Sequence, residues 1–315
     1  MNATINVILP TYNGEPYIVR QLETLAAQTY DTLHVFLRDD GSSDHTVEKI
    51  QTFIDRYQGP KQFTLLPSDG INLGVPGAFY HILRHCTPAP YYALCDQDDE
   101  WYPQKTEWAM EKLTGEENAG RGASAEIPLI YYSRCDYKDE QGNLLRESPH
   151  QEAHPPLHKV LYHTPASGFT CVFNEALRRK MVLEHTPGDE LQDRYLIRGA
   201  VCFGKTVYDD RKTAAHIRHA SAVTSGDADN RSLFRNFLEK ELQGSAPLKE
   251  KKGLQHFYEE FRDELTEADK NELRLFAADA TGLPLRLQKL FYRKRLRTRL
   301  AGEAAFRLLF LTGKI

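Results

Sequence analysis

Three carboxylates stand within four residues directly after a short apolar run, and their spacing indicates a cation site. Asp96, Asp98 and Asp99 follow residues 91–95, which are mostly apolar and include two aromatic side chains. Such a run is typical of a buried strand, and a parallel sheet binds its ligands just beyond the carboxyl ends of its strands. Carboxylates this close repel one another unless a cation lies between them, and hard oxygen ligands suit Mg²⁺ or Mn²⁺ that also binds phosphate. For Asp-x-Asp alone, a solvated acidic turn is an equally good interpretation.

The segments before these acids alternate between predicted strands and helices. Apolar runs at residues 5–9, 33–37 and 63–66 predict strands, and each is followed by apolar residues at helical spacing. Three rounds of strand, turn and helix imply right-handed crossovers and a parallel sheet with helices on both faces. The loops at residues 10–14, 38–44, 72–77 and 96–101 then share one edge of that sheet, where a doubly wound fold binds a nucleotide.

Two common nucleotide-binding classes lack their phosphate-binding element in this sequence. Neither Gly-x-Gly-x-x-Gly nor a Gly-Lys-Ser/Thr loop occurs, which argues against a dinucleotide-dependent dehydrogenase and against a P-loop protein. A metal ion bound by Asp98 is the remaining means of binding a phosphate group.

The four loops resemble the successive motifs of family 2 glycosyltransferases with the GT-A fold. The motifs are Leu-Pro-Thr-Tyr-Asn-Gly at 9–14, Arg-Asp-Asp-Gly-Ser-Ser-Asp at 38–44, Asn-Leu-Gly at 72–74 and Cys-Asp-Gln-Asp-Asp-Glu-Trp at 95–101. The last of them is most similar to the rhamnosyltransferase-like branch. The resemblance implies an α/β fold of the GT-A type, with a Rossmann-like, mostly parallel sheet flanked by helices.

The resemblance also implies roles for individual residues of the donor site. Pro10, Tyr12 and Asp40 would hold a pyrimidine base, with Asp39 beside it. The other loop residues placed by the resemblance at the nucleotide-sugar site are Thr11, Asn13, Asn72, Gly74 and Gln97. Alternatively, Asp39 and Asp44 only cap the following helix, and Tyr12 packs on the edge of the sheet.

The resemblance further implies a metal site for Mn²⁺ or Mg²⁺. Asp98 would bind the metal that bridges the donor diphosphate, and Asp96 would face the ribose or the metal shell. His219 lies in a segment similar to the family's Tyr-Arg-x-His and is a candidate for a further metal ligand or diphosphate contact, because neutral imidazole suits Mn²⁺. His216 is expected to be structural.

A second carboxylate candidate stands at a predicted helix start. Residues 188–196 place acids in the first turn of a helix, which suits the helix dipole. Relatives have His-Asp-Trp-Trp here, and the resemblance implies that Asp193 is the general base. An inverting transferase needs one such carboxylate, to take the proton of the acceptor hydroxyl. At the other positions of this motif the sequence has Gln192, Arg194 and Tyr195 instead of the family's residues. The alternative candidates for the base are Asp189 and Glu190.

Two other segments of the second half have less specific patterns. The small residues at 166–168 lead into a predicted strand and would let a ligand approach the backbone closely. A histidine cluster comprises His150, His154, His158 and His163. Because Pro155 and Pro156 would break the helix needed to bring two of these rings together, we expect a surface or acceptor loop there instead of a metal site.

The chain has 315 residues, 41% of them hydrophobic, which is enough for one large α/β domain with an appendage or for two domains. We expect a catalytic domain at 1–230, with a donor half at 1–115 and an acceptor half at 116–230, and a helical extension at 231–315. The net charge of -4 gives no reason to expect nucleic acid as a partner.

The end of the chain is basic and amphipathic. Against the single acid Glu303, residues 283–315 carry Arg286, Lys289, Arg293, Lys294, Arg295, Arg297, Arg299, Arg307 and Lys314. A basic amphipathic helix is typical of membrane-surface binding, since each Lys or Arg near an anionic leaflet contributes about 1 kcal/mol. The alternative is a helix that packs on the catalytic domain with its charges in water.

The cysteine pattern and the N-terminus predict the compartment. The five cysteines are widely spaced with no Cys-x-x-Cys pair, which favours a reduced protein. The first residues lead directly into a strand without the pattern of a signal peptide, and no apolar run approaches a membrane span. We therefore expect a cytoplasmic protein, with peripheral contact to the inner face of the cell membrane through the basic tail.

These patterns together predict an inverting, metal-dependent glycosyltransferase. It would move rhamnose or another hexose from a UDP- or dTDP-sugar to a hydroxyl of a growing, lipid-linked cell-surface glycan. Two alternatives remain. A sugar nucleotidyltransferase would need a Gly-rich phosphate loop with a basic residue after the first strand, which residues 10–14 lack. A nucleotide-sugar-binding protein that has lost catalysis is the other, and the departures around Asp193 leave it open.

Overall fold

In the computed structural model, the strands of the first two thirds of the chain form one mixed β-sheet. The structure describes residues 2–67, 70–119, 127–218, 246–279, 282–297 and 300–313. Internal contacts divide the chain into two units. The sheet unit comprises Met1–His154, Pro165–His185 and Leu191–Ala220, and the helical unit comprises Pro155–Thr164, Thr186–Glu190 and Ser221–Ile315. The boundary expected at residue 230 lies outside the described residues.

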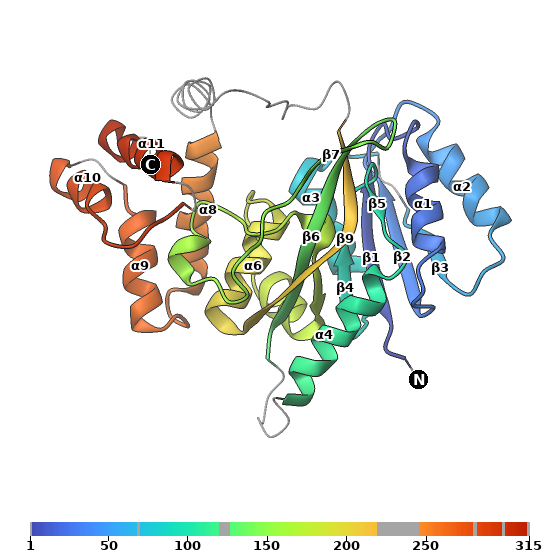
Figure 1. Ribbon diagram of the computed structural model, residues 1–315, viewed down its shortest axis with the longest axis horizontal. Helices are drawn as coiled ribbons and strands as arrows, with labels where there is room; N and C mark the ends of the chain where they lie inside the picture. Colours follow the sequence, from blue (N-terminus) through green and yellow to red (C-terminus); the bar gives the residue numbers. More distant parts are fainter. Residues whose placement is uncertain are drawn as a thin grey trace. The chain divides into compact units, whose positions relative to one another are not determined.

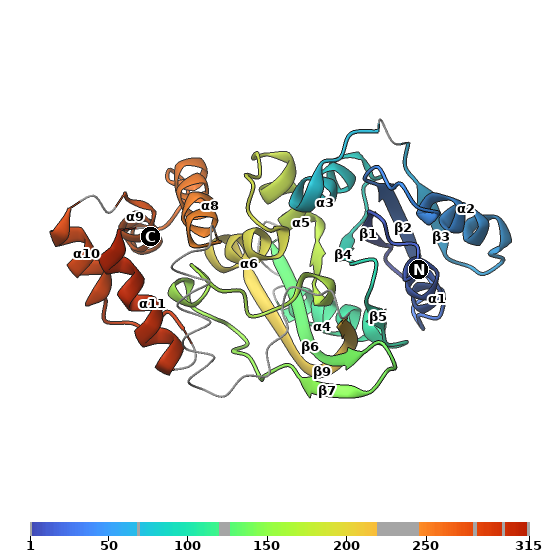
Figure 2. The same ribbon diagram turned by 90° about the horizontal axis from the view of Figure 1, so that it is seen from above.

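The N-terminal half of the sheet is parallel, as the sequence predicts. The strands are β1 (Ile5–Thr11), β2 (Leu33–Asp39), β3 (Gln62–Leu65) and β4 (Tyr91–Leu94), in the order β3-β2-β1-β4. The connecting helices are α1 (Ile18–Ala26), α2 (Thr46–Arg56) and α3 (Gly74–His85). Helix α3 lies on the opposite side of β1 and β2 from α1 and α2 (Figures 1 and 2). The carboxyl ends of β1, β2 and β4 therefore meet at one edge.

Beyond β4 the sheet becomes mixed. Strand β8 (Val172–Asn174) pairs antiparallel with both β4 and β6 (Leu129–Asp139). The long β9 (Lys205–Arg218) runs parallel to β6. The helices that follow β4 in this unit are α4 (Lys105–Ala119), α5 (Glu175–Arg178), continued by a π-helical turn at Arg179–Leu183, and α6 (Gln192–Phe203).

A two-residue strand joins the acidic turn to the far end of β9. Strand β5 (Glu100–Trp101) pairs antiparallel with β9, with Glu100 opposite Ala215 and Trp101 opposite Ala214. Its residues follow Asp99 directly in the chain. The pairing therefore places the last residues of β9 beside the acids that end β4.

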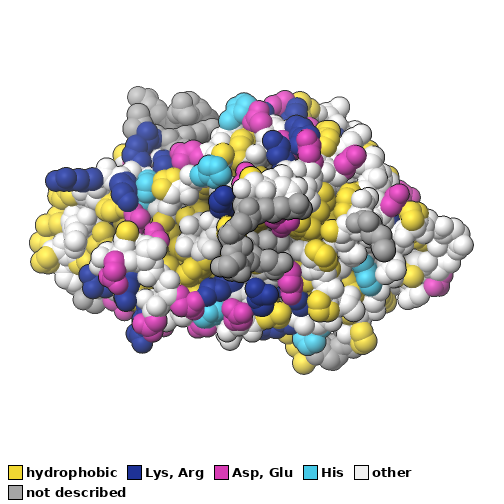
Figure 3. Space-filling model, turned by 90° about the horizontal axis from the view of Figure 1, so that it is seen from below, with side chains coloured by type: hydrophobic (Ala, Val, Ile, Leu, Met, Phe, Trp, Pro, Cys, Tyr) yellow, Lys and Arg dark blue, Asp and Glu magenta, His cyan; other side chains and the backbone are white. Residues whose placement is uncertain are grey.

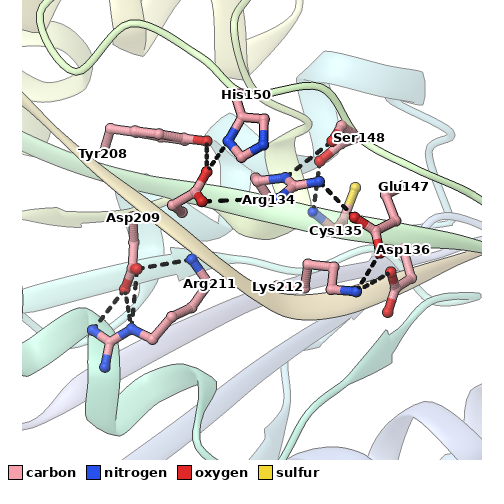
Figure 4. Close-up of polar contacts among 11 residues, drawn as sticks. Arg134, Cys135, Asp136, Glu147, Ser148, His150, Tyr208, Asp209, Arg211 and Lys212 are labelled. Carbon is pink, nitrogen blue, oxygen red and sulfur yellow. Dashed lines mark hydrogen bonds and ion pairs between the residues drawn. The ribbon is translucent and has the colours of Figure 1, made fainter.

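Ion pairs tie the hairpin of β6 and β7 (Leu144–Glu147) to β9, as Figure 4 shows. The carboxylate of Glu147 lies 2.7 Å from both Arg134 and Lys212. Lys212 also contacts Asp136 at 3.3 Å. Single surface pairs contribute about 0–1 kcal/mol each, but shared partners fix the geometry of all three strands. The hairpin predicted around residues 140–143 is thus held at both its strands.

The helical unit has its own apolar core. Its helices are α8 (Ala246–Phe261), α9 (Glu267–Ala277), α10 (Leu283–Leu290) and α11 (Leu300–Thr312). The ring of Tyr162 contacts the rings of Phe276, Phe306 and Phe310, and all four side chains are buried. The segment around residue 162 thus belongs to the core of this unit.

The expectation of one final amphipathic helix was wrong, because the segment forms two helices. The buried side chains of α11 are Glu303, Phe306, Leu309 and Phe310. Lys289 of α10 is also fully buried, and its ammonium donates to the carbonyls of Phe276 and Ala278. Burial lowers the pKa of Lys289 to about 8. Part of the predicted basic tail therefore serves the internal packing of the unit.

Alanine substitution at two glycines tests the packing of the sheet unit. A Cβ on Gly204, at the end of α6, would lie 1.8 Å from the carbonyl oxygen of Pro128. A Cβ on Gly115, within α4, meets nothing within 4 Å. We expect Gly204→Ala to lower the free energy of unfolding by about 3 kcal/mol. Gly115→Ala should raise it by about 0.5–1 kcal/mol through helix propensity. Urea unfolding monitored by circular dichroism measures the free energy of unfolding of both variants. Equal values for the two variants would contradict this packing.

Candidate functional site

A cavity of about 440 Å³ opens at the carboxyl edge of β1, β2 and β4. Val75, Ala78 and Phe79 form the part of its wall that α3 contributes. The residues assigned from the sequence that line it are Pro10, Thr11, Tyr12, Asp40, Asn72, Gly74, Asp96, Gln97 and Asp98. The structure thus brings residues of all four loops named in the sequence analysis to one cavity. The apolar wall from α3 was not assigned to the site from the sequence, because its spacing is that of an ordinary core helix.

Asp40 fixes the loop that forms one wall of this cavity. Its carboxylate accepts hydrogen bonds from the backbone N–H groups of Leu73, at 3.0 Å, and Gly74, at 2.7 Å, and it pairs with Arg38. The side chain of Asn72 donates to the backbone carbonyl of Asp40 at 2.8 Å. Gly74 has a φ of +61°, which L-residues with a side chain rarely adopt. The conformation of residues 72–74 is therefore set by a buried carboxylate.

Asp39 and Asn13 hold the neighbouring loop. Asp39 accepts from the hydroxyl groups of Thr11, at 3.1 Å, and Ser42, at 2.6 Å, and from the N–H groups of Gly41 and Ser42. The Asn13 side chain accepts from the N–H of Ser43 at 2.8 Å. Neither Asp39 nor Asn13 lies among the lining residues of the cavity. The contacts of both residues position the loop that follows β2.

Tyr12 and Gln97 join the β1 loop to the acidic turn. The Gln97 amide accepts from the backbone N–H of Tyr12 and donates to its carbonyl, each at 3.0 Å. A Cβ on Gly14 would lie 2.3 Å from the Gln97 amide oxygen, so a glycine leaves room for this pair. The Tyr12 side chain is 51% exposed, and its ring is available to a flat ligand in the cavity.

Asp96 lies at the centre of a group of carboxylates. Burial raises the pKa of Asp96 well above its ordinary value, and the charges of Asp99, Asp98 and Asp193 add to the increase. Asp98 lines the 440 Å³ cavity and also a second one of about 350 Å³, whose other lining residues include Asp99 and Arg20. The Asp98 carboxylate therefore stands between two cavities.

Asp193 reaches this group from the start of α6. A Cβ on Gly168 would lie 3.6 Å from the Asp193 Cβ and 3.8 Å from the Leu94 Cδ1, so α6 begins close to the last residue of β4. The glycine predicted to let a ligand approach the backbone therefore lies next to the start of α6. The structure thus brings Asp193 to Asp96, about a hundred residues away in the sequence. Asp189 and Glu190, the alternative bases, belong by contact to the helical unit.

His216 holds the most deeply buried of the three acids in the turn. Its Nδ1 lies 2.7 Å from the Asp99 Oδ1, and the Asp99 side chain has no exposed surface. Burial raises the pKa of Asp99 to about 6, although the hydrogen bond from His216 opposes the increase. Burial of the ring opposes protonation of His216, but the hydrogen bond and the charge of Asp99 raise its pKa above the ordinary value. Sequence reasoning missed this pair because β5 is too short to be predicted.

The carboxylates are suited to a metal ion that is also coordinated by a phosphate group of the substrate. Among the described residues, no three His, Cys, Asp or Glu side chains are arranged to hold a metal ion by themselves. Mg²⁺ is commonly bound by one or two carboxylates together with substrate phosphates, so Asp98 with Asp96 is a sufficient set of protein ligands. Burial is the main cause of the raised pKa values of Asp96 and Asp99, and the neighbouring carboxylates add to both increases. His219 lies outside the described residues.

The histidine cluster has other contacts where it is described. His150 contacts Asp210 at 2.5 Å, and His158 lies 3.8 Å from Glu272. None of the five cysteines, all of them within the described residues, forms a disulfide. Within the described helices, none has the length and apolar character needed to span a membrane.

Comparison with known proteins identifies the family. The sequence profile named Glycosyl transferase family 2 matches residues 6–184, more than half of the chain. The chain therefore belongs to glycosyl transferase family 2.

Characterised relatives match shorter segments. The "dTDP-rhamnosyl transferase RfbG" of Shigella flexneri is 33% identical over 107 residues, which are 33% of this chain and 36% of that protein. The "UDP-Glc:alpha-D-GlcNAc-diphosphoundecaprenol beta-1,3-glucosyltransferase WfgD" of Escherichia coli is 30% identical over 109 residues, or 35% of this chain and 40% of that protein. The matched segments thus span little more than a third of these relatives.

Solved structures confirm the GT-A fold. The S. aureus TarS 1–349 complex with UDP-GlcNAc has a TM-score of 0.55 at 16% identity, covering 99% of this chain and 90% of that one. The mannosyltransferase PcManGT from Pyrobaculum calidifontis, in complex with GDP-Man and Mn²⁺, has a TM-score of 0.53 at 16% identity, covering 100% of this chain and 87% of that one. The predicted fold, a sheet of the GT-A type flanked by helices with a helical C-terminal region, is therefore correct.

The contact between Gly14 and Gln97 can be tested without a ligand. Gln97→Ala removes two hydrogen bonds and should lower the free energy of unfolding by about 1 kcal/mol. Gly14→Ala should have a similar effect, because its methyl group displaces the Gln97 amide. The double variant should be no less stable than Gln97→Ala alone, since the three atoms nearest to that methyl group all belong to Gln97. Additive losses in a urea-unfolding double-mutant cycle would show that Gly14 is needed for another reason.

Proposed function

We propose that the protein is an inverting, metal-dependent glycosyltransferase that uses a UDP- or dTDP-sugar. The observation that carries the proposal is the position of Asp98 between two cavities, with Asp193 close to its neighbour Asp96. One cavity suits a nucleotide, because it combines an exposed aromatic ring, an apolar wall and carboxylates at one end. The second provides a route for an acceptor on the other side of Asp98.

The residues of the site divide into donor and acceptor functions. Tyr12 and the wall from α3 hold the nucleoside, and the loops positioned by Asp39 and Asp40 keep the cavity open. Asp98, with Asp96, holds Mn²⁺ or Mg²⁺, which when bound neutralises charge on the departing nucleoside diphosphate. Asp193 accepts the proton of the acceptor hydroxyl as that oxygen attacks the anomeric carbon. A single base and no protein nucleophile give inversion at that carbon.

The relatives support the choice of substrates. RfbG is named as a dTDP-rhamnosyl transferase, and WfgD is named for UDP-Glc and a diphosphoundecaprenol acceptor. We therefore propose rhamnose or another hexose as the transferred sugar, and a lipid-linked cell-surface glycan as the acceptor. A nucleotide-binding protein without catalysis is the second candidate, favoured by the changed residues around Asp193. A nucleotidyltransferase is disfavoured, because residues 10–14 contribute no basic side chain to the cavity.

A lipid-linked acceptor calls for contact with a membrane, and α10 offers a surface for it. Leu283, Leu287 and Phe291 recur every four residues on one face and are 63%, 37% and 73% exposed. The exposed basic side chains that follow are Arg293, Lys294 and Arg295. Figure 3 shows apolar and basic side chains next to each other in the region of the helical unit that carries α10. We propose that this surface binds an anionic leaflet of the cell membrane from the cytoplasm.

Substitution of the two aspartates tests the chemistry. In an assay of UDP-, dTDP- and GDP-sugars with and without Mn²⁺, Asp98→Ala should abolish metal-dependent donor hydrolysis and transfer. Asp193→Asn should keep donor affinity but lower kcat for transfer by about 10²–10⁴-fold, because only the base is lost. Asp55→Asn, an exposed acid on α2, is the control and should be neutral. Full activity of Asp98→Ala, or loss of donor binding in Asp193→Asn, would refute the assigned roles.

Vesicle flotation tests the membrane surface. Wild-type protein should float with vesicles of phosphatidylcholine and phosphatidylglycerol, and less with phosphatidylcholine alone. The double variant Leu287→Ser, Phe291→Ser should bind about tenfold more weakly, because its apolar contact is lost. The matched control is Leu144→Ser, Leu145→Ser, which removes two leucines of similar exposure from β7. An equal loss of vesicle binding in both double variants, or no loss in either, would contradict the proposed role of α10.

A further inference from the structure

The bond between His216 and Asp99 links two parts of the chain that the sequence separates widely. Asp99 ends the acidic turn, and His216 lies two residues before the end of β9. The Nδ1–Oδ1 distance is 2.7 Å. The adjacent pairing of β5 with β9, with Glu100 opposite Ala215, brings the two residues to the same position along the sheet. The turn that presents Asp98 is therefore attached to β9 by both a backbone ladder and a side-chain bond.

The surroundings of His216 fix the orientation of its ring. The ring stacks on Phe169, with centroids 5.8 Å apart and planes 15° apart. Its face is also met by Tyr137 edge-on at 5.7 Å. A ring held between two aromatic neighbours has few orientations available, so the direction of its Nδ1 is set before any ligand binds. The hydrogen bond to Asp99 therefore does not depend on the donor.

Asp99 is held by the protein through one of its two carboxylate oxygens. Its side chain is fully buried, whereas Asp98 borders both cavities. One Asp99 oxygen is bound to His216, and the backbone of Ile217 also hydrogen-bonds the carboxylate. The three acids of the turn thus differ in role: the one in the middle of the motif faces the cavities, and the last one anchors the turn.

We propose that His216 is a positioning residue, which fixes the acidic turn through Asp99 so that Asp98 faces the metal and the donor diphosphate. This inference rests on the proposed function. Hydrogen-bond partners of this kind, one step removed from the ligands, typically affect metal affinity by 10–100-fold. The functional atom of His216 is Nδ1, and its Nε2 makes no required contact with donor or metal.

Two amide substitutions separate these atoms. In Asn the side-chain amide nitrogen stands near the place of Nδ1, and in Gln it stands near that of Nε2. We expect His216→Asn to retain Mn²⁺-dependent UDP binding within about threefold, and His216→Gln and His216→Ala to weaken it about 10–100-fold. Titration calorimetry of UDP in the presence of Mn²⁺ measures this. His34→Ala is the control, because His34 is a strand histidine that bonds Thr64 at 2.8 Å away from this turn.

Kinetics and spectroscopy complete the test. Excess Mn²⁺ should restore kcat of His216→Ala to near the wild-type value, since a positioning defect acts through metal affinity. A ¹H–¹⁵N spectrum of the ligand-free protein should show a hydrogen-bonded Nδ1–H, lost in Asp99→Ala. Rescue by Gln instead of Asn would assign the function to Nε2 and overturn the proposal. Wild-type protein that binds neither UDP nor dTDP with Mn²⁺ would overturn the proposed function as well, whereas normal binding of the same nucleotide by His216→Ala would overturn only this inference.

Discussion

The repulsion among carboxylates at the end of β4 is the constraint on which the rest of the site depends. Asp96, Asp98, Asp99 and Asp193 lie close enough for their charges to raise the pKa of Asp96. Such a group is unfavourable in a folded protein unless the backbone holds it in place and a cation compensates it. The contacts around it meet the first requirement: Gln97 binds the backbone of Tyr12, and His216 binds Asp99. The second requirement would be met by the metal ion of the proposed function.

A division of labour among the acids follows from their hydrogen bonds. Asp39 and Asp40 accept several hydrogen bonds from the protein, Asp99 bonds His216, and all three are buried. Asp98 instead borders both cavities. Carboxylates that organise loops through backbone N–H groups pre-arrange the cavity, so less ordering is required when the donor binds. The same residue type thus serves as scaffold in one position and as candidate ligand in the next, and only its surroundings distinguish the two.

The sequence predicts the parallel half of the fold well because its signals are local. The runs at residues 5–9 and 33–37 are apolar except for Asn6 and His34, as is typical of strands buried on both faces, and the apolar stripe of α1 has clear helical spacing. The mixed half of the sheet depends instead on pairings between strands that are distant in the sequence. Strand β5 has two residues and no pattern of its own, so its pairing with β9, and hence the contact of His216 with Asp99, could not be foreseen. Asp193 was found through motif resemblance, since no local rule places α6 beside β4.

The C-terminal region shows why charge and periodicity do not determine which face of a helix is exposed. Lys289 and Phe291 are separated by one residue in a basic, amphipathic segment, and residue type alone would place the lysine in water and the phenylalanine in the interior. The structure reverses both: Lys289 is fully buried and donates to two carbonyls at the end of α9, while Phe291 is 73% exposed. A buried lysine satisfies backbone carbonyls that would otherwise lack partners at a helix end, and this can offset the desolvation of its charge. The exposed apolar stripe of α10 is therefore the face that the described residues of the helical unit leave uncovered.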